Sequence, residues 1–418
     1  MGHADGVKST EPLAAPITHA NLPNRVTLIV LLGGLSAFGP LSLDTYLPAL
    51  PELQSEFNTT TALAQFTLSA CLLGLATGQI VAGSISDKYG RHWPLMAGLA
   101  LYAVASVLCA LAPSIWILIL ARFVQGAAGG AGVVIARATV RDLHEGTAAA
   151  KYFSRLMLIS GLAPILAPII GGQLLRFTDW RGIFVFLAMV GIVLLVAAFV
   201  LLPKTLPEDR KQLGGISQTL SRFGVLVHDR VFMGYALTMG FTGAALFGYI
   251  ASSPFIMQEI YNLSEQQFSL IFGSIAIGFI VSSQINARLV GRRPLRQMLG
   301  AALTVFALCG LLLLAFILMG FGLIGILIPL YAMMWTMGFI FPNAIALALT
   351  NYPHAAGAAS AFLGLSQFAT GAIAAPLVGV AGEGTAVPMG IIIAVSACGA
   401  LAAFIRMTRP IEPTVVVQ

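Results

Sequence analysis

The sequence predicts an all-α integral membrane protein with 12 transmembrane helices in two six-helix pseudo-repeats. Three observations predict this fold class: an apolar composition, the number of apolar runs and an internal repeat. The chain has 418 residues, of which 58% are hydrophobic and 9% are charged, and its mean hydropathy is +0.91. A soluble domain carries about 25% charged residues. Because a spanning helix needs about 20 apolar residues, this chain has room for about twelve spans with short connections.

Apolar runs between charged or Pro/Gly breaks define the expected spans in order. In the first half they cover 26–47, 61–83, 94–112, 115–138, 152–175 and 182–202. In the second half they cover 231–255, 267–288, 297–319, 322–349, 357–381 and 387–405. The longest polar connection, 203–230, is expected to be a central cytoplasmic linker between bundles at 26–202 and 231–406. Residues 1–25, which lack the central apolar stretch of a signal peptide, and residues 407–418 are expected to be cytoplasmic tails.

The distribution of basic residues predicts the orientation of these spans. With the N-terminus inside, 19 of the 22 Lys and Arg residues fall in cytoplasmic segments. The other three are Arg176 and Arg181 on the outside and Arg122 within a helix. The positive-inside rule therefore predicts both termini in the cytoplasm, as in a multi-pass protein of the bacterial inner membrane.

Two short matches indicate that the halves repeat each other. Residues 167–171 read Ala-Pro-Ile-Ile-Gly and residues 375–379 read Ala-Pro-Leu-Val-Gly, at an offset of 208. Gly90-Arg91 after the second span matches Gly291-Arg292 after the eighth, at an offset of 201. Two parallel six-helix repeats are typical of transporters whose halves rock about a substrate site at the bilayer midplane.

The loop expected between the second and third spans carries the most specific short motif. Residues 83–92 read Gly-Ser-Ile-Ser-Asp-Lys-Tyr-Gly-Arg-His. Asp87 can face the positive N-terminus of a neighbouring helix, and Arg91 can bind acidic or carbonyl groups, so the loop can latch the two halves on the cytoplasmic side. The candidate gating residues are Gly83, Asp87, Gly90 and Arg91. The alternative is a solvated turn with ordinary positive-inside charge.

Asp44 and Arg122 are the two charges well inside predicted spans, and each is expected a few residues from the outer end of its helix. Intramembrane charges are costly, so they face the protein interior and are commonly functional. A structural ion pair is one interpretation. The other is a proton site: burial favours a neutral Asp44 whereas a nearby Arg122 favours the charged form, so a modest rearrangement switches Asp44 between its loaded and empty states.

The fifth span contains two prolines between small residues. Residues 161–172 read Gly-Leu-Ala-Pro-Ile-Leu-Ala-Pro-Ile-Ile-Gly-Gly. Prolines bend a helix and small residues allow helices to approach closely, so the segment predicts a tight pivot beside the central cavity. The residues expected to form it are Gly161, Pro164, Pro168, Gly171 and Gly172.

These motifs together resemble the major facilitator superfamily. The 83–92 loop, Arg122-Phe123-Val124-Gln125-Gly126 and the 161–172 segment are similar to its loop, helix-four and antiporter motifs, with Ala167 where the antiporter form has Gly. Residues 43–51, Gln65 to Ser69 and Val140-Arg141-Asp142 resemble its bicyclomycin and chloramphenicol resistance (Bcr/CflA) branch. The resemblance implies the major facilitator fold and a drug:proton antiporter with one protonatable residue in the first helix.

Position alone suggests which side chains line the substrate pocket, because an apolar cavity leaves little trace in a sequence. For each candidate residue, ordinary packing within the helix bundle is at least as good an interpretation as contact with the substrate. The candidates are Tyr46, Gln65, Gln125, Tyr235, Phe247, Tyr249, Trp335, Met337, Asn343 and Gln367.

Other classes of function find little support in the sequence. The six histidines are scattered over tails and loops without ligand spacing, so no metal site is expected. The glycine-rich run 126–132 has no preceding strand, so helix packing is expected there and not a nucleotide loop. The four cysteines lie in apolar runs as packing residues. The basic residues form no arm or stripe for nucleic acid.

We therefore expect a monomeric exporter, not an enzyme, that needs no cofactor and uses protons as its coupling ion. Its expected substrates are small lipophilic antibiotics, phenicol-like or bicyclomycin-like, and a single intramembrane carboxylate favours an uncharged solute. The alternative is a proton-coupled exporter of a cellular metabolite or sugar, because the fold alone does not separate these functions.

Overall fold

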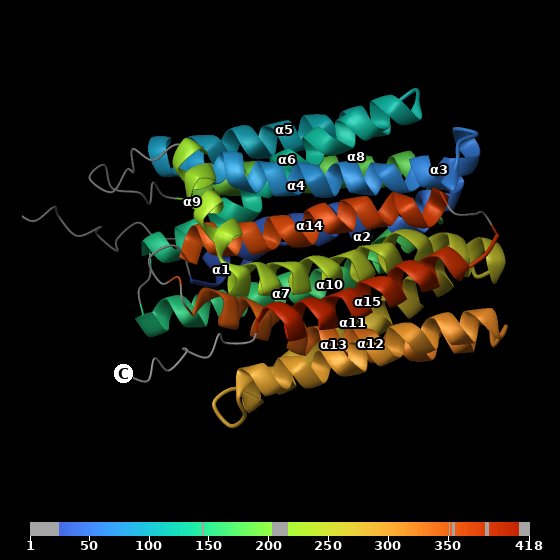
Figure 1. Ribbon diagram of the computed structural model, residues 1–418. Coiled ribbons are helices and arrows are strands. Elements are labelled where there is room, and N and C mark those ends of the chain that lie inside the picture. Colours follow the sequence, from blue (N-terminus) through green and yellow to red (C-terminus); the bar gives the residue numbers. More distant parts are fainter. Residues whose placement is uncertain are drawn as a thin grey trace, which may run out of the picture.

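The computed structural model of the chain is a bundle of long helices that run roughly side by side (Figure 1). It describes residues 25–143, 146–202, 216–350, 352, 356–380 and 384–408. The predicted fold class is confirmed: the chain is an all-helical, multi-pass membrane protein. The predictions for the two tails fall almost entirely outside the described residues.

Over its described residues, the N-terminal half comprises eight α-helices and one short 3-10 helix. They are α1 (Arg25–Ser36), α2 (Phe38–Asp44), η2 (Leu47–Ala49), α3 (Leu50–Glu56), α4 (Thr61–Tyr89), α5 (His92–Ala110), α6 (Ile115–Leu143), α7 (Gly146–Leu174) and α8 (Trp180–Leu201).

The C-terminal half follows a connecting helix, α9 (Ile216–His228). Its elements are α10 (Arg230–Pro254), the π-helix η4 (Phe255–Ile260), α11 (Glu265–Leu289), α12 (Leu295–Leu318), α13 (Gly322–Leu349), α14 (Ala356–Val380) and α15 (Val387–Met407). Ten of the described helices are long and apolar enough to cross a membrane, and α1 with α2 and α3 forms an eleventh, bent span. The apolar part of α7, Ile159–Leu174, is shorter.

The first span is broken, which corrects the continuous helix predicted at 26–47. The chain bends by 47° between α1 and the segment Phe38–Glu56. Pro40 cannot donate a backbone hydrogen bond to the preceding turn, and Pro48 is the second residue of the short 3-10 helix η2. Prolines are a common cause of such kinks. As a result, Asp44 ends a helix of seven residues.

Three helices extend by five or six residues beyond the predicted boundaries at one end of the bundle: α4 to Tyr89, α6 to Leu143 and α7 from Gly146. α4 continues to Tyr89, so Gly83 lies inside a helix and not in the predicted loop, which shrinks to Gly90 and Arg91. The polar residues 84–88 form the last turns of α4, and Arg91, just beyond its end, forms an ion pair with Asp87. Gly90 has φ +90° and its repeat partner Gly291 has φ +84°, so both loops use glycine at a position where φ is positive.

The predicted linker 203–230 contains the helix α9, which the sequence analysis did not predict. Phe223 and Leu226 are buried on one side of α9, and the Phe223 ring contacts Phe362 at 5.2 Å between centroids. α9 packs against α4 of the first half and against α10 and α14 of the second. The connection therefore has an apolar face that bridges both halves, while residues 203–215 lie outside the described residues.

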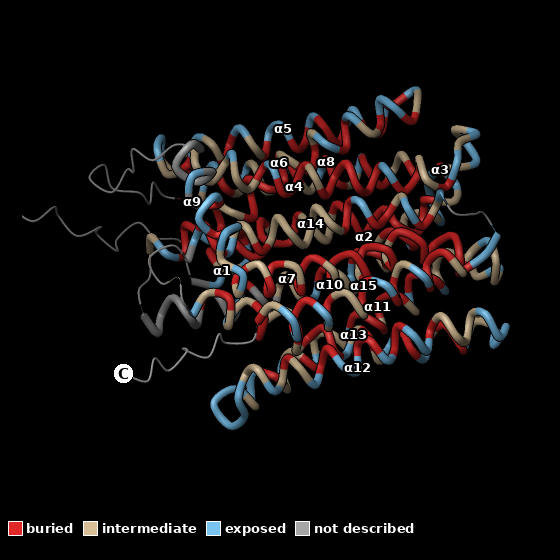
Figure 2. Tube along the Cα trace, in the orientation of Figure 1, coloured by how far each residue is buried: buried red, intermediate tan, exposed pale blue. Residues whose placement is uncertain are grey.

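Glycines let the helices of the first half approach closely. A Cβ on Gly126 would lie 2.1 Å from the carbonyl oxygen of Cys71, and one on Gly74 would lie 2.1 Å from that of Phe123. The run 126–132 therefore serves helix packing, as predicted. Figure 2 shows the buried residues concentrated in the interior, with exposed ones at helix ends and on outer helices.

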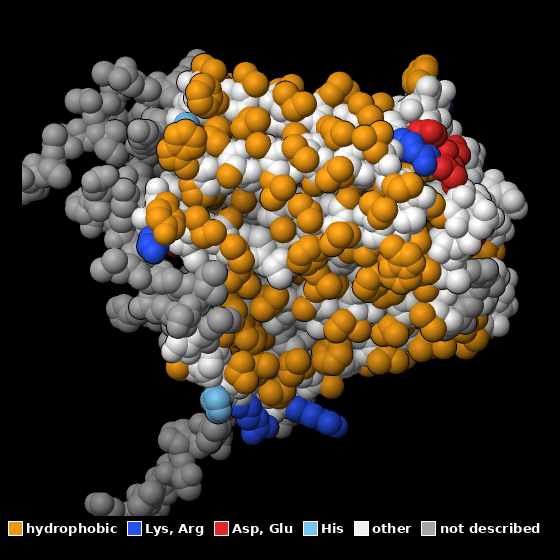
Figure 3. Space-filling view, turned by 90° about the horizontal axis from the view of Figure 1, so that it is seen from above, with side chains coloured by type: hydrophobic (Ala, Val, Ile, Leu, Met, Phe, Trp, Pro, Cys, Tyr) orange, Lys and Arg blue, Asp and Glu red, His pale blue; other side chains and the backbone are white. Residues whose placement is uncertain are grey.

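The two halves meet where α4 packs on α14 and α7 packs on α11. We call the end of the bundle with the 89–92 loop the inner end and the opposite end the outer end. On the face in Figure 3, hydrophobic side chains cover most of the surface and charged side chains lie near its margins. A wide apolar surface of this kind suits contact with lipid.

Candidate transport site and gates

Asp44 lies at the C-terminal end of α2, buried at the seam between the halves. Its exposure is 6%, and no hydrogen bond or ion pair joins its carboxyl group to another described residue. The Tyr249 side chain on α10 lies within electrostatic reach of Asp44, and its hydroxyl group has no hydrogen-bond partner either. The Tyr249 ring stacks on Phe272 at 5.4 Å. The site thus joins an unpaired acid from one half to an unpaired hydroxyl group from the other.

Arg122 lies on α6 at the centre of a second polar cluster. The side chain is fully buried and its Nη1 donates a hydrogen bond of 2.6 Å to Gln125. Gln125 in turn donates to Ser106 on α5 at 2.7 Å. The guanidinium carbon lies 4.9 Å from the Tyr46 ring centre and 5.4 Å from that of Phe184, distances that suit cation–π attraction.

Asp44 and Arg122 do not form an ion pair. The ion pairs among described residues are Arg91 with Asp87, Arg91 with Asp142 and Arg181 with Glu56. Nε and Nη2 of Arg122 have no hydrogen-bond partner. The structure therefore does not contain the structural ion pair that the sequence left open, and an ionisable acid and a guanidinium group lie buried in the same half without an ion-pair partner. Such groups are costly unless they are paired or neutralised.

The inner loop forms a charge network within the first half. Nε of Arg91 donates to Asp142 at 2.8 Å, and Nη1 donates to Ser86 at 2.9 Å and also to Asp87. Burial alone would lower the pKa of Arg91, but the hydrogen bonds and charges of Asp142 and Asp87 raise it. The predicted contact of Arg91 with acidic groups is present. Asp87 has Arg91 as its partner and no helix N-terminus of the other half in the described contacts.

The glycine pair in α7 contacts both the Asp44 segment and the opposite half. A Cβ on Gly171 would lie 2.0 Å from the carbonyl oxygen of Thr45, directly after Asp44. A Cβ on Gly172 would lie 2.4 Å from Oγ of Ser269 on α11. Gly161, where the nearest such contact is 3.7 Å, is far less constrained. Pro164 and Pro168 both lie inside α7.

Three glutamines close the outer end of the seam. The side-chain amide of Gln65 on α4 donates to the carbonyl of Ala251 at 3.1 Å. Gln258 in η4 donates to the carbonyl of Pro48 at 3.1 Å, and Gln266 on α11 donates to that of Gly172 at 2.9 Å. Each bond crosses from one half to the other. Gln65, predicted to line the substrate pocket, lies in this gate, and sequence reasoning missed Gln258 and Gln266.

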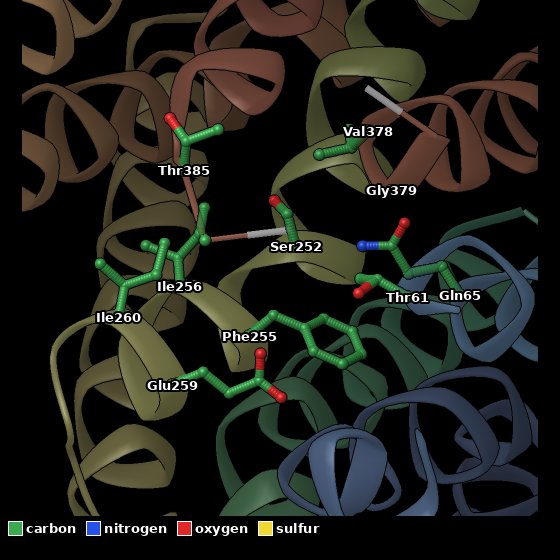
Figure 4. A pocket seen from close by; sticks show the side chains of 11 residues that line it. Thr61, Gln65, Ser252, Phe255, Ile256, Glu259, Ile260, Val378, Gly379 and Thr385 are labelled. Carbon is green, nitrogen blue, oxygen red and sulfur yellow. The ribbon is translucent and has the colours of Figure 1, made fainter. Parts of the chain in front are cut away.

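A small cavity lies beside this gate (Figure 4). Its volume is about 20 Å³, which is about the space that one water molecule occupies. It is too small for a drug-sized solute, which needs a few hundred Å³. Its lining comes from both halves and consists of Thr61, Gln65, Ser252, Phe255, Ile256, Glu259, Ile260, Val378, Gly379, Gly384 and Thr385.

The other predicted pocket residues are not gathered in one place. Tyr46 and Gln125 belong to the Arg122 cluster and Tyr249 lies near Asp44, as described above. Asn343 is buried and donates to Asn286 at 2.8 Å. Tyr235, Phe247 and Met337 are buried in the second half, Gln367 packs against Gly243, and Trp335 is 42% exposed.

Sequence comparison places the chain in a known family. The chain belongs to the Major Facilitator Superfamily, whose sequence profile matches residues 30–376. It is 39% identical over 387 residues to "Uncharacterized MFS-type transporter YdgK" of Bacillus subtilis, which covers 92% of this chain and 96% of the relative. It is 30% identical over 361 residues to "Bicyclomycin resistance protein homolog" of Haemophilus influenzae, with 86% and 91% covered. The resemblance to the bicyclomycin resistance branch is thereby confirmed.

The fold also matches solved structures of the same class. The crystal structure of a single-residue mutant of the nucleoside transporter NupG aligns with a TM-score of 0.74 at 13% identity and covers 92% of this chain and 99% of that chain. At this identity the likeness shows the fold. With the family, it identifies the protein as a membrane transporter and not an enzyme.

Proposed function

We propose that this protein exports small lipophilic antibiotics, phenicol-like or bicyclomycin-like, from the cytoplasm in exchange for protons. Asp44 supports this proposal most strongly. It is a buried carboxyl group without a partner, at the seam where the halves meet. A carboxylate there would be costly, so the neutral acid suits this conformation. The relative named for bicyclomycin resistance supports an antibiotic as the solute.

The geometry suggests how proton binding is linked to the gates. The outer gate is closed by the three glutamines while Asp44 is unpaired. When Asp44 releases its proton toward the cytoplasm, the carboxylate needs a cation, and Arg122 has two unpartnered nitrogens in the same half. Movement of α2 toward Arg122 also moves Thr45, whose carbonyl rests on Gly171. Because Gly172 packs on α11 of the other half, this movement reaches the seam.

The remaining parts of the proposal concern location and gating. We place the protein in the inner membrane with both termini in the cytoplasm, because basic residues are concentrated at the inner end. The Asp87–Arg91–Asp142 network then lies on the cytoplasmic side. There it holds the inner ends of α4, α5 and α6 together while the halves rock. We further propose that the monomer is the transporting unit.

The experiment compares the intact chain with Asp44→Asn in a bacterial host that lacks its own pumps. Growth is measured with phenicols, bicyclomycin, fluoroquinolones and a lipophilic cation, and proton release is measured in proteoliposomes that contain the purified protein. We expect protection and drug-driven proton release from the intact chain and neither from the variant. Glu52→Gln, at an exposed carboxyl group near the outer end, is the matched control and keeps both activities.

Two results would overturn parts of the proposal. Proton-coupled efflux by Asp44→Asn would remove Asp44 as the coupling site and leave the substrate class intact. Failure of the intact, well-expressed chain to protect against any drug would instead favour export of a metabolite or sugar. In that case, counterflow with labelled sugars and metabolites identifies the solute.

A further inference from the structure

The loop between α11 and α12 presents three arginines at the inner end of the second half. Arg288 lies in the last turn of α11, and Arg292 and Arg293 follow Gly291 in a tight turn. The amides of Arg292 and Arg293 both donate to the carbonyl of Leu289, at 2.9 and 3.1 Å, which fixes the turn. All three side chains are exposed, and none has a hydrogen bond or ion pair to another described residue.

In the equivalent loop of the first half, the arginine is buried and paired with acidic residues. Arg91 follows Gly90 as Arg292 follows Gly291, but Arg91 is 6% exposed and bound to Asp87 and Asp142. Four residues before Arg292, where the first half has Asp87, the second half has Arg288. The second half therefore has a cation, Arg288, at the position where the first half has the acid that pairs with its loop arginine.

The long stretch of sequence around this loop contains no acid that could compensate the charge. Between Glu265 and Glu383 the sequence contains no Asp or Glu, whereas it contains four arginines within 288–296. The fourth, Arg296, donates to the carbonyl oxygen of Thr408 at 2.6 Å and is already engaged. Among the described residues, none supplies an anion to the other three through an ion pair or side-chain hydrogen bond, so they are available to an anion from outside the chain.

The surrounding surface places these arginines at the level of lipid headgroups. Ile277 and Val281 on α11 are 48% and 40% exposed, and their spacing of 11 and 7 residues from Arg288 puts all three on one face of the helix. Val290, within the loop, is 48% exposed as well. An apolar helix face that ends in basic residues matches a membrane surface, with acyl chains along the helix and phosphates at its end.

We propose that Arg288, Arg292 and Arg293 form a binding site for the phosphate headgroup of an anionic phospholipid in the inner leaflet. Guanidinium groups bind phosphate oxygens through paired hydrogen bonds. The site holds the inner end of the second half at the headgroup plane, while the corresponding loop of the first half is neutralised from within. The inference rests on the proposed topology and does not depend on the exported solute.

The test titrates the purified full-length protein in detergent with phosphatidylglycerol or phosphatidylcholine and counts bound lipids by native mass spectrometry. The variant is Arg292→Gln with Arg293→Gln. The matched control is Lys88→Gln with Arg141→Gln, which removes two exposed basic residues from the inner end of the first half. We expect the preference for phosphatidylglycerol to fall about tenfold in the first variant and to stay unchanged in the control.

Further arms separate a specific site from general charge. Arg292→Lys with Arg293→Lys keeps the charge and should retain part of the preference for phosphatidylglycerol. In the intact protein, 1 M salt should weaken this preference.

Unchanged phosphatidylglycerol binding by the glutamine variant overturns the proposal. Equal losses in variant and control also overturn it, because they indicate attraction to the whole inner end. Displacement of the lipid by millimolar inorganic phosphate would show a free-anion site and overturn the lipid assignment. If the glutamine variant does not insert, the lysine variant and the salt titration decide alone.

Discussion

The two halves share a helical architecture but differ in what they bury. Within its membrane-spanning helices the first half buries a carboxyl group and a guanidinium group, Asp44 and Arg122, that are not paired with each other. In the described residues of the second half, the comparable buried contact is a neutral amide pair, Asn286 with Asn343. The second half shows that this architecture packs without buried charge. The charges of the first half therefore fit a function better than a structural need, since unpaired buried charges reduce stability.

Replacing Arg122 with Gln tests the charged side of this comparison and has the largest expected effect. Drug-driven proton release in proteoliposomes should be nearly abolished because the deprotonated Asp44 loses its proposed partner. The melting temperature should change little, because removal of a buried charge offsets the loss of the hydrogen bond to Gln125 and of the cation–π contacts. Retained proton release with lower stability would show that Arg122 is a structural residue.

Gly171→Ala tests whether the Asp44 segment depends on close contact with α7. The added methyl group would lie 2.0 Å from the carbonyl oxygen of Thr45, so the backbone must move, at a cost of about 1–3 kcal/mol. Thermal unfolding in detergent and transport both report this loss. Gly161→Ala is the matched control, with its nearest contact at 3.7 Å, and should behave like the intact chain. Equal behaviour of the two variants would contradict the proposed link.

Asn343→Ala tests the neutral side of the comparison. We expect a loss of about 1 kcal/mol of stability, typical of an interhelical hydrogen bond within a membrane. The number of protons released per drug molecule should not change. A double-mutant cycle with Asn286→Ala isolates the energy of the pair. A change in proton stoichiometry would show that coupling extends into the second half.

Gln65→Leu tests the outer gate and has the smallest expected effect. Loss of one hydrogen bond of about 1 kcal/mol should shift the population toward the outward-open state a few-fold. Distances between spin labels at the outer ends of α4 and α14 measure this shift. Gln54→Leu, at a glutamine that accepts a hydrogen bond from Thr61 within the same half, is the control. An unchanged distance distribution in Gln65→Leu would exclude Gln65 as a gate residue.

The sequence predicts most of the fold because lipid imposes a simple rule: each span must be a long apolar helix. The exceptions have local causes. The break after Ser36 arises beside Pro40, and α9 is a short amphipathic helix outside the membrane, which a search for long apolar runs does not detect. Gly90 and Gly291 were matched by sequence spacing, and both have a positive φ.

The site was only partly predictable. Intramembrane charge marks Asp44 and Arg122 because charge is rare and costly in a span. Their partners depend on how the helices are rotated and tilted, which the sequence does not specify, so the expected proximity of the two charges is not seen as an ion pair. Gln258 and Gln266 donate to backbone carbonyls of the other half. Because every residue has a backbone carbonyl, no sequence pattern marks these acceptors. The acceptor of Gln266, the carbonyl of Gly172, lies in the last turn of α7, where backbone carbonyls lack partners within the helix.

The break in the first span also gives Asp44 a lever arm. α2 is seven residues long, or about 10 Å at 1.5 Å per residue. A tilt of about 10° at Ala37 would therefore swing the carboxyl group by roughly 2 Å, enough to make or break a hydrogen bond, while α1 stays in place. An unbroken helix from 26 to 47 would have to tilt as a whole, against all of its neighbours, to achieve the same displacement.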